Sequence, residues 1–294
     1  MFSIIVPSYN RNAEIAALLE SLEQQTVKNF EVVVVDDCSQ NAVKIDRTFS
    51  FHVHIIRNAQ NAGPAESRNI GARTANNEWL LFLDDDDRFA DEKCALLSEA
   101  INQHPEINFI YHPAECLMVN ENFTYFTHPY ENIKDLTLDN ILAVNKIGGM
   151  PMIGIKKDFF FNVGGLSNEL KSLEDYDFLL KVLSNQDFSP KYINQPLTKC
   201  TFHTKRASVS TNTTNTEKAI VYIQQRYVKT EQQKKNFYLN SLYMLAYPNI
   251  MNLSREAAKY YFAMFKCDYN LRSLVIALII LISPKLMINL KRFI

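Results

Sequence analysis

Cysteine and glycine are scarce in this sequence, and no apolar run is long enough to cross a bilayer. The 5 cysteines among 294 residues are odd in number, lie far apart and form no Cys-x-x-Cys pair, so neither a disulfide framework nor a structural zinc site fits. This cysteine usage indicates a reducing compartment. The N-terminus lacks a basic segment and no secretory signal is visible, so we expect the cytoplasm. With only 7 glycines, each is expected where the backbone requires one.

An excess of either charge is also missing. The 31 Lys and Arg residues nearly balance the 32 Asp and Glu residues, which disfavours nucleic acid as a partner. Hydrophobic residues make up 47% of the chain and charged residues 21%, which is a globular composition. The length allows one large α/β domain or two smaller ones.

The C-terminal segment 271–294 is strongly apolar but interrupted. Its unbroken apolar stretch, 274–282, is about half of the roughly 20 residues that a membrane-spanning helix needs. Pro284 and Lys285 end the stretch, and Lys291 and Arg292 follow. Two interpretations stay open here: a buried C-terminal helix, or a helix that lies in the membrane interface.

Strand and helix signals alternate in the first half of the chain. Apolar, β-branched runs predict strands at 2–6, 30–35, 51–56, 78–83 and 108–111. Helices are predicted to begin near Asn12, Pro64 and Asp91. Because the strand runs do not alternate apolar with polar residues, they indicate a mostly parallel sheet with helices on both faces.

The pattern loosens after residue 112. A hairpin is predicted at 116–119 and 123–127, and helices at 158–162 and 173–183. The Thr/Asn/Ser-rich segment 208–216 predicts a mobile loop or linker, and residues from 217 onward are expected to be helical.

The strongest local signal is a run of four aspartates, Asp84, Asp85, Asp86 and Asp87 (the aspartate run), which follows a predicted buried strand. Open α/β sheets bind ligands at the carboxyl ends of their strands. In an extended chain Asp84 and Asp86 would point one way and the other two the opposite way. Like charges this close repel by several kcal/mol, and a divalent cation such as Mg²⁺ or Mn²⁺ would reverse that sign. The alternative is a solvated acidic turn that caps the next helix.

Two further polar groups follow predicted strands. Asp36 and Asp37 follow strand 30–35, where a carboxylate can accept a hydrogen bond from a uracil N3–H or from ribose hydroxyls, or can cap a turn. Tyr9 follows the first strand after Pro7 and can stack on a base, or can be an ordinary aromatic at the rim of the fold.

Two more signals lie at predicted helix starts. Arg68 lies in the first turns of a helix that opens near Pro64, where it could reach a diphosphate or pair with a surface glutamate. Glu174 and Asp175 open an apolar-striped helix, where acidic residues also occur simply because they suit the helix dipole.

Together these five segments resemble the family-2 glycosyltransferases with the GT-A fold. The resemblance covers residues 2–205 and is most specific over 61–87. The matching segments are SIIVPSYNR (3–11), VVVVDDCS (32–39), NAGPAESRNIGARTANNEWLLFLDDDD (61–87), GGL (164–166) and EDYDFLLK (174–181). The family usually has glycine where this chain has Cys38, which leaves the turn there uncertain.

The resemblance implies an enzyme that transfers a sugar from a nucleotide-sugar with inversion at the anomeric carbon. Pro7 and Tyr9 would contact the uracil and Asp37 its N3–H; Arg68 would lie near the diphosphate. Asp84 would face the ribose or sugar, with Asp85 and Glu174 as further substrate contacts. Asp86 would bind Mn²⁺ or Mg²⁺, and Asp175 would be the general base. His203 or the pair Lys205-Arg206 could be a further metal or diphosphate contact.

The expected fold is therefore an α/β GT-A fold with a Rossmann-like, mostly parallel sheet and a C-terminal helical extension. We expect residues 1–112 to bind the nucleotide-sugar, 113–207 to bind the acceptor and catalyse transfer, and 208–294 to form a helical region with a possible interfacial segment at 271–294.

The resemblance also suggests a substrate pair and a location. The donor would be a UDP-hexose, with glucose or galactose as the guess, and the acceptor a saccharide on a polyprenyl diphosphate. Such enzymes assemble bacterial O-antigen, capsule or exopolysaccharide, which places the chain peripherally on the inner face of the plasma membrane. Two alternatives remain: a Mg²⁺-dependent phosphohydrolase, disfavoured because no aspartate directly follows the first strand, and a non-catalytic nucleotide-sugar-binding protein.

Overall fold

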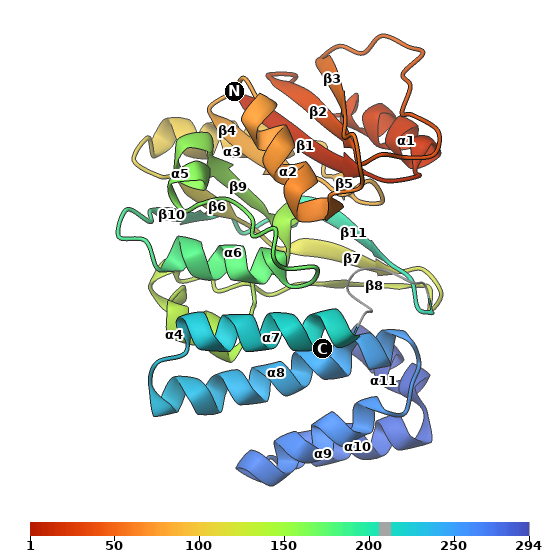
Figure 1. The fold of residues 1–294 in the computed structure, drawn as a ribbon, viewed down its shortest axis with the longest axis vertical. Helices are drawn as coiled ribbons and strands as arrows, with labels where there is room; N and C mark the ends of the chain where they lie inside the picture. The colour runs from red at the N-terminus through yellow and green to blue at the C-terminus, as the bar shows by residue number, and fades with distance from the viewer. Residues whose placement is uncertain (206–212, 294) are drawn as a thin grey trace.

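The computed structural model describes residues 1–205 and 213–293, which form two β-sheets, flanking helices and a stack of C-terminal helices (Figure 1). The larger sheet has seven strands in the order β10-β6-β9-β4-β1-β2-β3. Its strands are β1 (Phe2–Ser8), β2 (Phe30–Asp36), β3 (His52–Arg57), β4 (Trp79–Phe82), β6 (Phe109–Tyr111), β9 (Ile153–Lys156) and β10 (Pro190–Tyr192).

The central sheet is mostly parallel, which confirms the prediction. Strands β4, β1, β2 and β3 run parallel, and β10 runs parallel to β6. Strand β9 is antiparallel to both of its neighbours, β4 and β6, and was not predicted as a strand. Since β9 and β10 come after residue 112, the sheet continues across the expected boundary there, and that division remains a functional proposal.

Alternate residues of the strands build two separate cores. Ile5 belongs to the core under α2 (Gly63–Thr74), α5 (Lys157–Asn162) and α6 (Glu174–Leu183). Ile4 belongs to the opposite core, under α1 (Asn12–Leu22) and α3 (Lys93–Gln103). Burial on both faces explains the uninterrupted apolar strands, since each fully buried aliphatic side chain contributes about 1.5–3 kcal/mol.

A second sheet of four strands has the order β5-β11-β7-β8. Its strands are β5 (Arg88–Phe89), β7 (Ala114–Met118), β8 (Phe123–Phe126) and β11 (Thr198–Phe202). The predicted hairpin is confirmed: β7 and β8 pair antiparallel with Met118 opposite Phe123. Because β5 begins one residue after Asp87, the aspartate run connects the two sheets.

The C-terminal region is helical, as predicted, but its first helix starts early. Its helices are α7 (Thr213–Tyr227), α8 (Glu231–Met251), α9 (Ala257–Asp268), α10 (Leu271–Ile282) and α11 (Pro284–Leu290). Helix α7 begins inside the segment 208–216 that was predicted as a linker, so that prediction is wrong for its last four residues. The buried Thr216 explains this, because its hydroxyl lies 3.2 Å from that of Ser172, two residues before α6.

Helix α8 lies between α4 (Leu138–Ala143) and the last helices and contacts both. A capping box between Thr230 and Gln233 fixes its start. On one side Asn240 donates a hydrogen bond of 3.0 Å to the carbonyl of Leu142 in α4. On another side Leu242 and Ala246 belong to the core shared with α9, α10 and α11.

Helix α10 is neither membrane-spanning nor fully buried. No helix in the described part of the chain is long and apolar enough to cross a bilayer. Of the 12 residues of α10 only Ala277 and Ile280 are buried, so a buried C-terminal helix does not describe it. Its other face is exposed and apolar, with Leu271, Val275, Leu278 and Ile282 between 48% and 70% exposed.

Candidate active site

A cavity of about 980 Å³ opens at the carboxyl ends of β1, β2 and β4. Of the described candidate residues, Asp36 and Lys205 do not line it, whereas ten others do, although these are up to 196 positions apart in sequence. They are Pro7, Tyr9, Asp37, Arg68, Asp84, Asp85, Asp86, Glu174, Asp175 and His203. Arg206 lies outside the residues that the structure describes.

Pro7 and Tyr9 line the cavity at the end of β1. The sequence suggested that Pro7 ends the strand, but β1 continues to Ser8, whose carbonyl accepts a 2.8 Å hydrogen bond from the amide of Asp37. Tyr9 is 49% exposed, so about half of the residue is available to a ligand.

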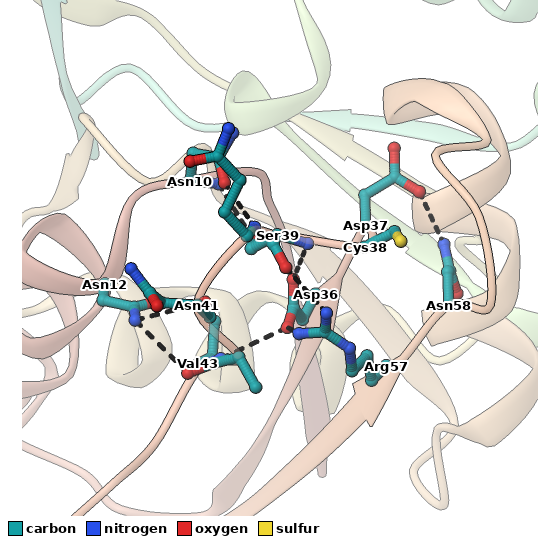
Figure 2. A network of polar contacts seen from close by, with 12 residues as sticks. Asn10, Asn12, Asp36, Asp37, Cys38, Ser39, Asn41, Val43, Arg57 and Asn58 are labelled. Atoms are coloured by element: carbon teal, nitrogen blue, oxygen red, sulfur yellow. Dashed lines mark hydrogen bonds and ion pairs between the residues drawn. The ribbon is translucent and has the colours of Figure 1, made fainter.

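Asp36 and Asp37 have different surroundings (Figure 2). Asp36 is buried, and although burial disfavours its charge, hydrogen bonds from Ser39 and Val43 and the Arg57 guanidinium at 2.7 Å together hold its pKa below the usual value. It stabilises the loop after β2 and does not line the cavity.

Asp37 lines the cavity and also fixes the start of α2. Its carboxylate accepts hydrogen bonds of 2.8 Å from the side chain of Asn58 and from the amides of Ala62 and Gly63 (Figure 2 draws the first). A carboxylate has about four acceptor positions, so these three bonds leave one for a uracil N3–H. The hydrogen bonds also orient the group before any ligand binds.

Cys38 adopts the left-handed backbone conformation that favours glycine. Its φ is +63°, and its amide donates to the carbonyl of Asp36 at 2.9 Å. The turn that the sequence left uncertain is therefore the tight turn for which glycine is suited, and cysteine occupies it at a cost of about 1 kcal/mol.

The aspartate run forms a turn, so the expected alternation of an extended chain is wrong. The amide of Asp87 donates to the carbonyl of Asp84 at 3.0 Å, which closes the turn. The carboxylate of Asp87 accepts a hydrogen bond of 2.9 Å from the amide of Thr201 and so ties the turn to β11. Burial raises the pKa of Asp87, and the nearby charge of Asp84 adds to this effect.

Arg11 provides the positive charge beside this turn. Its Nη1 lies 3.2 Å from a carboxylate oxygen of Asp85 and 3.2 Å from one of Asp86. Burial nevertheless raises the pKa of Asp85 to about 7, against the opposing effect of Arg11. Sequence reasoning missed Arg11, and its position directly after SIIVPSYN was the only available signal.

Arg68 connects the aspartate run to the start of α6. Its guanidinium lies 2.6 Å from Asp84 and 3.1 Å from Glu174. The side chain is buried, and its Nε has no hydrogen-bond partner among the described residues. Arg68 thus holds in register two acidic segments that are 90 residues apart in sequence.

Asp175 lies in the first turn of α6, where the backbone at Gly149 also approaches its carboxylate. Burial raises its pKa to about 7, and the neighbouring charge of Glu174 adds to this, while a hydrogen bond from the amide of Tyr176 and the charge of Arg68 oppose it. The preceding Leu173 has a φ of +59°, which is strained for leucine and is typical of functional sites. A Cβ at Gly149 would lie 3.1 Å from Oδ2 of Asp175, so glycine lets this backbone approach the carboxylate.

The aspartate run suits a divalent metal ion only if a bound substrate supplies further oxygen ligands to the ion. No group of three or more His, Cys, Asp and Glu side chains within residues 1–205 and 213–293 is arranged to hold an ion. The donors are carboxylate oxygens, which Mg²⁺ and Mn²⁺ prefer; burial is the main cause of the raised pKa of Asp85, and the charges of Asp86 and Asp84 add to it. Diphosphate oxygens would therefore complete the coordination, and the residues present fit such a metal.

One wall of the cavity was not anticipated from the sequence. Residues of α8 line it at helical spacing and share one face of the helix, which we call the α8 face: Asn240, Tyr243, Met244, Tyr247 and Met251. Sequence patterns did not separate this face from the core-facing side of α8, because both are apolar or aromatic.

Comparisons with known proteins agree with this geometry. The family described as "Glycosyl transferase family 2" matches residues 3–160. An uncharacterized glycosyltransferase of Haemophilus influenzae is 62% identical over 292 residues, which are 99% of each chain. The amylovoran biosynthesis glycosyltransferase AmsB of Erwinia amylovora is 32% identical over 98 residues, which are 31% of this chain and 33% of that protein.

Two solved structures share the fold. S. aureus TarS in complex with UDP-GlcNAc matches with a TM-score of 0.60 and 21% identity, over 88% of this chain and 83% of that one. Mannosyltransferase PcManGT from Pyrobaculum calidifontis, in complex with GDP-Man and Mn²⁺, matches with a TM-score of 0.55 and 14% identity, over 99% and 86%. The family match over more than half of the chain and the H. influenzae relative together show that this chain is a member of glycosyltransferase family 2 with the GT-A fold.

Proposed function

We propose that this glycosyltransferase moves a hexose, glucose or galactose, from a UDP-sugar to a saccharide on a lipid diphosphate, with inversion. The observation that carries the proposal is the convergence of Tyr9, Asp37, the aspartate run and Asp175 on one cavity. The pathway we propose is the assembly of a bacterial surface polysaccharide, as the name of the amylovoran relative suggests.

The proposed reaction is an in-line displacement at the anomeric carbon. The acceptor oxygen forms a bond to that carbon as the bond from the carbon to the diphosphate oxygen breaks, and UDP leaves with the electron pair. Asp175 accepts the proton of the acceptor hydroxyl, a role that typically contributes 10²–10⁴-fold in rate. Attack from the face opposite to the diphosphate inverts the configuration.

On the donor side, Tyr9 stacks on the uracil and the fixed carboxylate of Asp37 accepts its N3–H. A divalent ion bound with the donor would offset the charge that develops on the diphosphate. Asp86 would hold that ion, and its neighbours in the aspartate run add to the local negative potential. Arg68 keeps Asp84 and Glu174 in register, so that the donor and the base remain aligned.

The exposed face of α10 supports the membrane part of the proposal. Residues 253–294 carry seven Lys or Arg and two Asp or Glu, although the whole chain has a net charge of −1. The apolar residues Leu271, Val275, Leu278 and Ile282 therefore lie on a positively charged part of the molecule. An apolar helix face with basic residues around it is suited to the interface of an anionic bilayer.

A thermal-shift panel tests the donor assignment. UDP-glucose, UDP-galactose, UDP-GlcNAc and GDP-mannose are compared with and without Mn²⁺. A bound donor at a hundredfold excess over its Kd stabilises the native state by about 2.7 kcal/mol. We expect a UDP-hexose to raise Tm in the presence of Mn²⁺ and Asp86→Ala to lose this increase. If none of the four nucleotide-sugars raises Tm, the proposal is wrong.

The role of Asp175 is tested by separating binding from transfer. Asp175→Asn should keep the donor-induced increase in Tm, because the amide has nearly the same shape. Incorporation of labelled hexose into lipid extracts of bacterial membranes should fall by about 10²–10⁴-fold. Incorporation at the wild-type rate by this variant would remove Asp175 from the mechanism.

A further inference from the structure

The α8 face lies on the other side of the base from the nucleotide-binding residues. The contacts of the two residues that flank Asp175 at the start of α6 support this order. Glu174 pairs with Arg68 at 3.1 Å on the donor side, and the Tyr176 hydroxyl accepts a hydrogen bond of 3.3 Å from Asn240 of α8. Asp175 lies between these two contacts in the chain, and both it and the α8 face line the cavity.

The α8 face offers aromatic rings and flexible apolar side chains without a formal charge. Tyr243 is 44% exposed although it belongs to a helix packed on two sides, and Tyr247 and Met244 are half-buried beside it. The hydroxyls of both tyrosines are protonated near neutral pH and can donate and accept hydrogen bonds. A tyrosine ring combines an apolar face with one polar edge.

The chemistry of this face matches a pyranose ring. A pyranose has an apolar C–H face and a rim of hydroxyls, and it carries no charge. An ion or a phosphate would find no opposite charge among these five residues, whereas a sugar can stack on a ring and hydrogen bond to its hydroxyl. In-line attack also requires the acceptor to approach from the side opposite to the diphosphate, and that is the side of α8.

We infer that the α8 face is the acceptor subsite and that Tyr243 stacks on the pyranose that receives the transferred sugar. This inference rests on the proposed function and extends it. Acceptor recognition then belongs largely to the C-terminal helical region, instead of to residues 113–207 alone. Tyr243 is a residue that determines acceptor specificity, while donor binding depends on the strand ends.

The experiment uses the full chain with UDP and Mn²⁺ and hexyl β-D-glucopyranoside, hexyl β-D-galactopyranoside and hexyl N-acetyl-β-D-glucosaminide as probes. Saturation-transfer NMR compares the signal from ring protons with that from the hexyl chain. We expect strong transfer to the ring protons of at least one probe. Tyr243→Ala should weaken its binding about tenfold, since an aromatic contact is worth about 0.5–1.5 kcal/mol beyond the buried area. Tyr243→Phe should retain it within about threefold.

Tyr238→Ala is the matched control, because Tyr238 is a tyrosine of α8 that is 50% exposed and does not line the cavity. Its probe binding should equal that of the wild type. Three results would overturn the inference: no probe binds the wild type, Tyr243→Ala binds as the wild type does, or only the hexyl chains receive saturation. UDP affinity is measured in parallel; failure of UDP to bind while the probes still bind through Tyr243 would count against the donor proposal alone.

Discussion

The surroundings of Asp175 disfavour the ionised carboxylate that the proposed reaction needs. Burial raises the pKa of the carboxyl to about 7, with Glu174 adding to the shift. The carboxylate form that accepts a proton is therefore a minor species in acid and the major species above neutrality. A base with a pKa near the working pH combines availability with proton affinity.

The first prediction concerns the pH dependence of transfer. Below pH 7 the value of kcat/KM should fall about tenfold per pH unit. Above about pH 8 the ionisation of Asp175 should no longer change it. Initial rates in a series of buffers at constant ionic strength measure it. A profile that is flat from pH 5 to 8 would contradict the assignment of Asp175 as the base.

The same raised pKa extends the first prediction to the pH dependence of stability. The native pKa of Asp175, about 7, lies above the ordinary aspartate value of 3.8, so between these pH values the native state binds more protons than the unfolded state. Stability due to this group therefore falls as pH rises through this window, and the full cost is present above pH 7. Asp175→Asn should raise the free energy of unfolding by about 1–3 kcal/mol at pH 8 and leave it nearly unchanged at pH 4. Equal effects at both pH values would contradict the raised pKa.

The second prediction tests the ion pairs of Arg68. Arg68→Gln should reduce the free energy of unfolding by about 2–4 kcal/mol, because it leaves the buried Glu174 without its positive partner. In a double-mutant cycle with Glu174→Gln, the double variant should be more stable than the sum of the single effects by about 1–3 kcal/mol. Urea unfolding of the four proteins measures this coupling, and strict additivity would show that the pair is not coupled.

At this scale the sequence predicted which residues are functional candidates but not what they contact. Strand-end and helix-start positions identified Asp37, Arg68 and Asp175, because the topology of a parallel sheet brings such positions together. The pairing of Arg11 with Asp85 and Asp86 could not be predicted, since it depends on how the aspartate run turns. The Asp87 amide closes this turn directly before strand β5, so the shape of the turn depends on where that strand lies in the folded chain.

At the scale of elements, α6 is the helix on which the site depends, and α7 holds it in place. The Tyr227 hydroxyl of α7 donates a 2.8 Å hydrogen bond to Asp177, which is fully buried on α6. Lys181 lies 3.3 Å from the other oxygen of the same carboxylate. The C-terminal helices thus stabilise the helix that begins with Glu174 and Asp175.

The third prediction follows from this contact. Tyr227→Phe should reduce the free energy of unfolding by about 1–3 kcal/mol, because the buried carboxylate of Asp177 loses a hydrogen-bond donor. Tyr222→Phe is the control, since its hydroxyl accepts an exposed hydrogen bond from Arg226 on the same helix. Its unfolding free energy should stay within about 0.5 kcal/mol of the wild type. If the two variants are equally stable, Tyr227 does not hold α6.

Elements with strong periodicity were predicted well from the sequence, and short ones were not. Strands β1, β2 and β4 are apolar on both faces and α1 has a clear stripe, so their positions were found within a few residues. Strand β9 has only four residues, and the pairing partners that make it a strand are distant in sequence. The early start of α7 depends on the burial of Thr216, which composition does not reveal.

At the scale of the whole molecule, the catalytic region and the exposed face of α10 lie at different levels of the structure (Figure 1). Helices α7 and α8 lie between them, and the cavity includes residues of both the strand ends and α8. An acceptor held at a bilayer under α10 would have to present its sugar along the α8 face. Residues 253–294, which carry a net positive charge, lie toward α10 and away from the acidic residues of the catalytic region.

The fourth prediction tests the exposed face of α10 with vesicles. Val275→Ser combined with Leu278→Ser should weaken sedimentation with phosphatidylcholine–phosphatidylglycerol vesicles by about tenfold, because two apolar contacts with the interface are lost. Binding of the wild type should also weaken with salt and with pure phosphatidylcholine. Val221→Ser is the matched control, since Val221 of α7 is 53% exposed, close to Val275 at 52%. Equal sedimentation of all three proteins would contradict membrane binding through α10.

The central claim is that one cavity holds the nucleotide between Tyr9 and Asp37 and a divalent ion at the aspartate run. A crystal structure of the full chain with UDP and Mn²⁺, with anomalous data at the manganese edge, tests it most directly. The account predicts an anomalous peak beside Asp86, with Arg11 moved away from that carboxylate, and uracil in contact with Tyr9. A peak remote from residues 84–87, or a nucleotide elsewhere, would contradict the account.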